Sequence, residues 1–310
     1  MNYDFDRIID RHNERSKTWD YRTLPPDTLP MHGAETHFCC PKPVQDAVKA
    51  VADQEIYGYP YFTDDFSKAA AGYMKRRRNW NCNPDWVEFV GGIVPGIAFA
   101  MQAVSVPGDK VLINTPAYGP FRDCIEANDR IVEESPLIVN PDKVRFDWED
   151  MEAKFSDPLV KAFILCDPHN PTGKNADKDE LLKISKLSEK YGVLIIVDEV
   201  HADFIFSGVH TEYPSISTFA EQHSVVVINP SKTFNVAGFR TGAVIVPNEK
   251  LRAAINKKIL AVKGISRTIT GVAAFEACYD GRSDDYVDQV SAYVKKTNSF
   301  WKSLQKTDFG

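Results

Sequence analysis

Residues 224–246 could place a lysine and an arginine at the end of a buried strand. An apolar, β-branched run at 225–228 predicts the strand, and Lys232 follows it, with Arg240 eight residues further on. Burial lowers the pKa of a lysine, and its neutral amine can then condense with a carbonyl group. A guanidinium binds phosphate through a planar fork of donors. A small molecule with an aldehyde and a phosphate, such as pyridoxal 5'-phosphate (PLP), would fit this pair.

The surrounding chain alternates short apolar runs with helical patterns. The predicted strands are 87–90, 110–114, 162–166, 193–197 and 225–228, and helices are predicted at 97–104 and 179–191, with further helices at both ends of the chain. This alternation predicts right-handed βαβ units and therefore an α/β fold with a mainly parallel central sheet flanked by helices. In such sheets ligands bind beyond the carboxyl ends of the strands.

Polar residues follow the predicted strands at those ends. Tyr118, Asn170 and Asp198 come after three separate apolar runs, and Lys232 follows a fourth. A glycine pair at 91–92 precedes a helix start, which leaves backbone N–H groups free to hold a phosphate. One cofactor could account for all of these positions.

Composition limits the classes of partner. The chain has 310 residues, 43% of them hydrophobic, and a net charge of −6, which argues against nucleic acid or an anionic membrane as the main partner. Its six cysteines show no CxxC spacing, and its charged beginning has no apolar signal segment. These features predict reduced thiols in a cytoplasmic protein, with no membrane-spanning run.

Several residues could suggest a metal site. They are His169, His201, Asp203 and His210. None of them has the close HxH or HExxH spacing of a zinc site. The sequence therefore predicts no metal.

Three motifs resemble a known family. NPTG at 170–173, Asp198 within IIVDEVH, and SKTFNVAGFR at 231–240 are similar to the class I/II aminotransferase superfamily, the fold-type-I PLP enzymes. More narrowly, DEVHAD and SKTFNVAG resemble the C–S β-lyase branch, whose members are similar to cystathionine β-lyase. The resemblance covers nearly the whole chain. It implies the parallel-sheet fold above, together with an incomplete small domain.

The resemblance implies that Lys232 is the catalytic residue, joined covalently to PLP and carrying the proton at the substrate Cα. Asp198 would pair with the pyridine nitrogen, and Asn170 would donate to the phenolic oxygen of the ring. His201 would either reach the same side of the ring or be a structural histidine.

The remaining cofactor contacts also come from the resemblance. Tyr118 would stack on one face of the ring while Val200 packs on the other. The phosphate would be bound by Arg240, Ser231 and the backbone N–H groups of Ile93 and Val94. Tyr59, or alternatively Tyr57 or Tyr61, would reach the phosphate of a neighbouring subunit, which implies a homodimer with shared active sites.

The predicted organisation has three parts. Residues 1–45 form an N-terminal arm and small-domain segment, 46–250 a PLP-binding large domain, and 251–310 connecting helices and a truncated start of the C-terminal small domain. Relatives continue further and supply an arginine for the substrate α-carboxylate, which has no counterpart here. His32 and Gly33 also depart from the usual pattern of the branch.

The resemblance implies a β-lyase that converts cystathionine, cysteine or cysteine S-conjugates to a thiol, pyruvate and ammonia. Two alternatives stay open at this point. One is an aminotransferase that uses the same lysine. The other is a catalytically impaired PLP-binding remnant, which the missing arginine suggests.

Overall fold

The computed structural model describes residues 1–11, 14–20, 25, 28–30, 33–140, 143–206, 208–262 and 267–304. Seven strands form the central sheet in the order β1, β9, β8, β7, β6, β2, β3. Their bounds are β1 Val87–Val90, β2 Lys110–Thr115, β3 Ile131–Pro136, β6 Val160–Cys166, β7 Leu194–Asp198, β8 Ser224–Ile228 and β9 Gly242–Ile245. A separate hairpin consists of β4 (Ile138–Asn140) and β5 (Lys143–Arg145).

Most neighbouring strands of the central sheet are parallel. The pairs β3–β2, β2–β6, β6–β7 and β7–β8 are parallel, whereas β9 runs antiparallel to both β8 and β1. The predicted mainly parallel sheet is therefore confirmed, and the apolar run at 241–246 is the strand that reverses direction.

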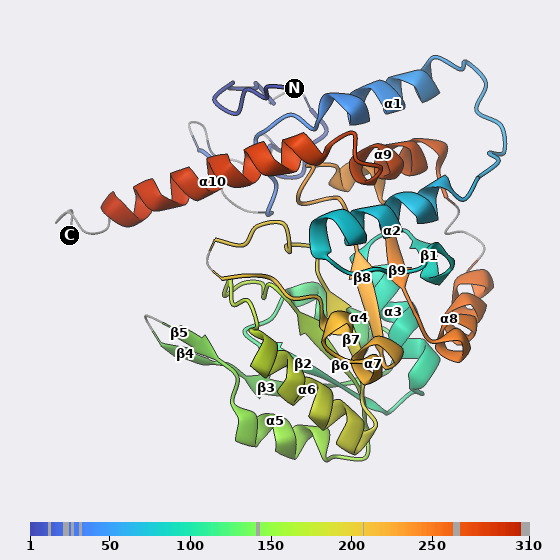
Figure 1. The fold of residues 1–310 in the computed structure, drawn as a ribbon, viewed down its shortest axis with the longest axis vertical. Coiled ribbons are helices and arrows are strands. Elements are labelled where there is room, and N and C mark those ends of the chain that lie inside the picture. Colours follow the sequence, from blue (N-terminus) through green and yellow to red (C-terminus); the bar gives the residue numbers. More distant parts are fainter. Residues whose placement is uncertain are drawn as a thin grey trace.

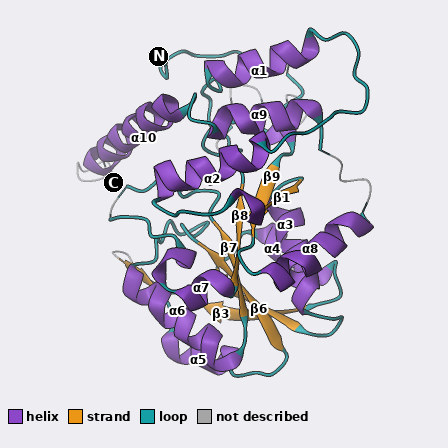
Figure 2. Cartoon of the chain, turned by 45° about the vertical axis from the view of Figure 1, so that its right-hand side comes forward, coloured by secondary structure: helices purple, strands orange, loops and turns teal. Residues whose placement is uncertain are grey.

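Helices cover both faces of this sheet (Figures 1 and 2). One face carries α5 (Trp148–Phe155), α6 (Lys178–Tyr191) and α7 (Thr218–Gln222), and the other carries α3 (Ile93–Val104), α4 (Gly119–Glu126) and α8 (Glu249–Ala261). At one end of the molecule lie α1 (Lys42–Ala52), α2 (Asp65–Arg78), α9 (Ile269–Tyr279) and α10 (Asp284–Leu304). Three short 3-10 helices are η1 (Pro84–Trp86), η2 (Tyr213–Ile216) and η3 (Ala237–Phe239). No described helix is both long and apolar enough to cross a bilayer, and the predicted cytoplasmic location stays a prediction.

The two faces of the sheet explain the unbroken apolar runs in the sequence. All five residues of β7 are buried. Ile195 and Val197 belong to the hydrophobic cluster on the α6 side, while Leu194 and Ile196 belong to the cluster on the α3 side. A strand that is covered on both faces needs apolar residues at every position, because successive side chains point to opposite faces.

Two helices begin earlier than the sequence predicted. Helix α3 starts at Ile93 rather than at residue 97, because Gly92 ends the preceding turn with φ +142° and Pro95 is tolerated in the first turn. Helix α8 starts at Glu249, two residues before the helical segment predicted from residue 251. There the Asn248 side chain accepts a hydrogen bond from the Leu251 N–H and caps the helix.

Gly96 lies where α3 approaches the sheet closely, and this contact gives a testable prediction. A Cβ at this position would lie 2.8 Å from Val227 Cγ1 and 3.1 Å from Val244 Cγ1. We expect Gly96→Ala to lower the free energy of unfolding by about 1–3 kcal/mol, because overpacking outweighs the better helix propensity of alanine. Chemical denaturation would measure the change.

Gly119→Ala is the matched control within a helix. No described atom lies within 4 Å of a Cβ built at Gly119. Its free energy of unfolding should therefore stay equal to that of the wild type or rise slightly. Equal stabilities of the two variants would contradict the tight contact at Gly96.

Candidate active site

The carboxyl ends of the central strands open onto a cavity of about 570 Å³. Parallel pairing places Cys166 beside Asp198, and Asp198 beside Val227, so the loops after β6, β7 and β8 meet at one edge. All of the predicted cofactor residues except Tyr59 line this cavity: Ile93, Val94, Tyr118, Asn170, Asp198, Val200, His201, Ser231, Lys232 and Arg240. The structure thus brings together residues that lie far apart in the sequence.

Asp198 is the last residue of β7 and only 3% of its surface is exposed. Its Oδ1 accepts a hydrogen bond from the Val200 N–H at 3.1 Å. Burial raises the pKa of this carboxyl group to about 6, against the opposing effects of that hydrogen bond and of the nearby Lys232 ammonium. A buried carboxylate with so little compensation suits a cationic partner in the cavity, such as a protonated ring nitrogen.

Lys232 lies in a tight turn directly after β8. Phe234 N–H donates to Pro230 O at 3.0 Å, and Val236 N–H donates to Ser231 O at 3.2 Å, which closes the turn. The lysine Nζ donates to the backbone carbonyl of Ala34 at 3.2 Å. Burial lowers the pKa of Lys232, which enlarges the fraction of neutral amine that can react with an aldehyde.

The amino end of α3 forms another wall of the cavity. Gly92 is its N-cap, and it contributes no side chain that could occupy the first free N–H groups. A Cβ at Gly242 would lie 3.0 Å from Ile228 O and 3.4 Å from Gly92 Cα, so the two backbones approach closely here. This cradle, with its positive helix-dipole end, fits a phosphate group.

Side chains complete that end of the cavity. Arg240 lines the cavity just after η3. It is an exposed residue, and its backbone is in the left-handed region with φ +49°. Asn229 Oδ1 accepts the Ser231 N–H at 2.8 Å and holds the turn that presents the Ser231 hydroxyl. The donor set is therefore guanidinium, hydroxyl and backbone amide, which are the groups that bind phosphate well.

An imidazole and a phenol ring also line the cavity, from His201 and Tyr118. Burial, with a smaller effect of the Lys232 charge, lowers the pKa of His201 to about 4, so its imidazole is neutral near pH 7. Tyr118 is the N-cap residue of α4, and its ring meets Phe121 edge to face with centroids 5.4 Å apart. Val200 and Asn170 line the cavity as well.

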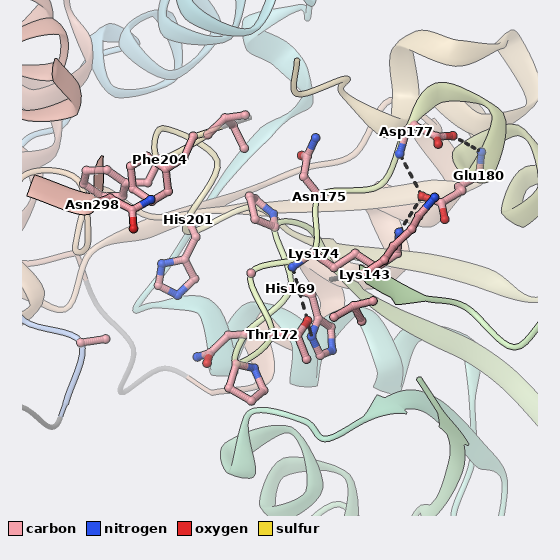
Figure 3. Close-up of a pocket in the computed structure, with 18 of the residues that line it drawn as sticks. Lys143, His169, Thr172, Lys174, Asn175, Asp177, Glu180, His201, Phe204 and Asn298 are labelled. Atoms are coloured by element: carbon pink, nitrogen blue, oxygen red, sulfur yellow. Dashed lines mark hydrogen bonds and ion pairs between the residues drawn. The ribbon is translucent and has the colours of Figure 1, made fainter. Parts of the chain in front are cut away.

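A second, more open cavity of about 850 Å³ adjoins the first (Figure 3). The two share Ala34, Asn170 and His201. Polar groups around the second cavity are largely paired with one another. Lys174 Nζ lies 2.7 Å from Glu180 Oε2, and His169 Nδ1 lies 2.9 Å from Thr172 Oγ1.

Tyr59 lies outside the cavity of its own chain. It belongs to the loop between α1 and α2, where Tyr57 and Tyr61 are exposed as well. Among the described residues that line the cavity, none comes from this loop. Its predicted contact with a second subunit stays a prediction.

The N-terminal arm contributes three side chains to the cavity that were not predicted. Lys17, Thr18 and Glu35 line the cavity, and Thr18 Oγ1 donates to Glu35 Oε2 at 3.1 Å. The only signal was the Gly33–Ala34 pair, whose φ values of +90° and +46° let the backbone turn into the cavity. His32, which departs from the usual pattern, lies outside the described residues.

A buried cluster of ionisable groups lies beneath the cavity. It contains Glu199, His210 and Glu212, with their ligand atoms within 4.8 Å of one another. Burial opposes protonation of His210, but the two glutamates raise its pKa to about 10. Arg78 Nε lies 3.5 Å from Glu212 Oε1. Burial and the neighbouring Glu212 raise the pKa of Glu199. The predicted absence of a metal stays a prediction.

Comparisons with known proteins assign this chain to a family. The sequence matches the aminotransferase class I and II family over residues 31–310, and the chain belongs to that family. It is 34% identical to cystathionine beta-lyase PatB of Bacillus subtilis over 98% of this chain and 79% of the relative.

Solved structures support the same family assignment. Cystalysin from Treponema denticola, which contains a PLP cofactor, has a TM-score of 0.93 at 30% identity, covering 100% of this chain and 80% of that one. A PLP-bound putative aminotransferase from Clostridium difficile 630 has a TM-score of 0.91 at 32% identity, covering 96% and 78%. The predicted family, the α/β fold class and PLP as the cofactor of the family are confirmed.

The raised pKa of Asp198 predicts a pH-dependent stability. Its folded pKa of about 6 exceeds the unfolded value near 3.8, so the group destabilises the fold increasingly as pH rises from about 4 to 6. We expect Asp198→Asn without PLP to raise the free energy of unfolding near pH 7 by roughly 1–3 kcal/mol. Urea unfolding of the PLP-free chain on both sides of this window would measure it.

Asp123→Asn is the control for this experiment, because Asp123 is an exposed aspartate on α4. It should leave the pH dependence of the wild type intact. An Asp198→Asn chain that loses as much stability as the wild type over the same pH window would show that Asp198 is not the group responsible.

Proposed function

We propose that this protein is a PLP-dependent C–S β-lyase that cleaves cystathionine, cysteine or cysteine S-conjugates to a thiol, pyruvate and ammonia. The observation that carries the proposal is the meeting of Lys232, Asp198 and Asn170 in one cavity at the strand ends. The 34% identity to a cystathionine beta-lyase over nearly the whole chain supports the choice of reaction.

Lys232 and Asp198 would carry the chemistry. When bound, PLP supplies an electron-withdrawing ring that stabilises negative charge at the substrate Cα. Lys232 would hold the aldehyde and would take the proton from the substrate Cα. The lowered pKa of Lys232 suits this task, because a lysine must have lost its proton before it can act as a general base. Asp198 keeps the ring nitrogen protonated.

Other residues would orient the ring and its phosphate. Asn170 donates to the phenolic oxygen from the loop after β6, and the neutral His201 lies close enough to the cavity to reach the same side. Tyr118 and Val200 enclose the two faces. Ser231, Arg240 and the α3 amino end, at Ile93 and Val94, hold the phosphate.

Incubation with cystathionine tests the proposal. We expect release of a thiol together with pyruvate, and a visible absorbance band from covalently bound PLP. Lys232→Ala should abolish both the band and the turnover, because the amine at the end of β8 that would hold PLP and move the proton is lost. Lys186→Ala, which changes an exposed lysine on α6, should keep both. Turnover in Lys232→Ala equal to that of the wild type would contradict the assignment.

The aminotransferase alternative is supported by the 32% identity to a putative aminotransferase of known structure. It predicts accumulation of the pyridoxamine form of the cofactor without thiol release. The β-lyase predicts thiol release without that accumulation. A stable PLP band without either product would favour a PLP-binding remnant, so the same incubation distinguishes all three functions.

We further propose a homodimer in which the exposed aromatic loop of one chain completes the cavity of the other. The loop presents Tyr57, Tyr59 and Tyr61 to solvent, and exposed aromatic residues are enriched where chains associate. Tyr59 would then reach the phosphate end of the partner's cavity. A symmetric dimer would contain two such shared sites.

Co-expression of Lys232→Ala with Tyr59→Ala chains tests shared sites. Each variant alone should have little activity, whereas a mixed dimer contains one cavity with both wild-type residues. Random pairing should therefore restore about a quarter of the wild-type activity. As a control, the two variants purified separately and assayed without subunit exchange should stay inactive. No recovery from the co-expressed pair would argue against Tyr59 as the shared residue.

A further inference from the structure

Asp203 is a buried carboxylate that the proposed chemistry does not use. It lies just after β7, and its side chain is only 7% exposed. Its Oδ1 accepts a hydrogen bond from Tyr73 Oη at 2.7 Å and forms an ion pair with Arg78 Nη2 at 2.8 Å, and both partners come from α2. Its Oδ2 accepts a hydrogen bond from Thr233 Oγ1 at 2.5 Å. Both carboxylate oxygens therefore have specific partners.

The third partner is the important one, because Thr233 is the residue next to Lys232. Thr233 is 2% exposed, and it lies in the turn closed by the hydrogen bonds between residues 230 and 236. Other contacts hold the turn as well, since Phe234 is fully buried and Asn235 Nδ2 donates to Thr36 O and Phe38 O. The hydrogen bond to Asp203 is the one made by the residue next to Lys232, so it bears most directly on the direction in which the Lys232 side chain leaves the backbone.

Asp203 and Asp198 belong to one compact segment. Ala202 N–H donates to Glu199 O at 3.0 Å and Phe204 N–H donates to His201 O at 2.9 Å, so the chain between the two aspartates is a folded turn. This segment carries the expected partner of the ring nitrogen at one end and the anchor of the Lys232 turn at the other. The anchor is itself fixed to α2 by Arg78 and Tyr73.

We propose that the Asp203–Thr233 hydrogen bond is a positioning link that sets Lys232 relative to Asp198. Asp203 and Thr233 are positioning residues, since they act through Lys232 and do not line the cavity. This inference rests on the proposed function, in which Lys232 must meet both the cofactor aldehyde and the substrate Cα. A small displacement of a reacting group costs a large factor in rate.

Thr233→Val tests the link, because valine keeps the shape of threonine and removes only the hydroxyl group. We expect kcat per bound PLP to fall about ten- to a hundredfold while KM stays close to that of the wild type. The pH at which the visible band of bound PLP changes should also move, by about half a unit or more, because the charges that face Lys232 (Asp198 from β7, Glu35 from the arm) would lie at altered distances.

Two further variants separate positioning from stability. Thr233→Ser keeps the hydroxyl and should restore both kcat and the pH midpoint of the band. Ser188 on α6 has an equally buried hydroxyl, which donates to Val193 O at 2.6 Å, and Ser188→Ala removes it. It should lower the melting temperature and leave the midpoint unchanged. If Thr233→Val does not fold, the comparison of Thr233→Ser with Thr233→Ala replaces it.

Each outcome decides the inference. A Thr233→Val protein with the wild-type midpoint and wild-type kcat per bound PLP overturns it, as does a change no larger than that in Ser188→Ala. If the wild type binds PLP but does not cleave cystathionine, only the proposed lyase activity is refuted. The pH midpoints of the PLP band in the wild type and the Thr233 variants then still test the Asp203–Thr233 link. A wild type that binds no PLP refutes both.

Discussion

The parallel pairing of β6, β7 and β8 is the constraint on which the site depends. It makes three successive strands end at the same edge, so that Asn170, Asp198 and Lys232 face one cavity although more than sixty positions separate the first from the last. The backbone hydrogen bonds of the sheet fix these ends before any side chain is considered. Antiparallel pairing of β7 with β8 would place the ends of these two strands at opposite edges.

The same region buries an unusual number of charges, and their compensation explains its architecture. Glu199 and Glu212 lie beside the cations His210 and Arg78, whereas Asp198 has only a backbone N–H and the more distant Lys232. Buried carboxylates are costly unless they are paired. Glu199 and Glu212 thus belong to one ionic cluster with His210, whereas Asp198 faces the cavity. This difference separates a supporting network from a binding group.

Much of the site was predictable, because periodic patterns and motif residues lie within short stretches of sequence. The apolar run of β7 and the acid at its end are read directly from IIVD, and the turn with Lys232 from SKT. The link between Asp203 and Thr233 was not predicted, although both residues stand in the motifs, since their contact joins separate loops. The roles of Thr18 and Glu35 on the arm were also missed, because a segment without regular structure has no period that reveals what it faces.

The hydrogen bond from Lys232 Nζ to Ala34 O joins the N-terminal arm to the amine that, in the proposed function, would react with the cofactor. Covalent attachment would end this contact, and the hydrogen bonds from Asn235 Nδ2 to Thr36 O and Phe38 O would then remain to hold the same end of the arm, so that one turn both presents the lysine and secures the segment that faces it.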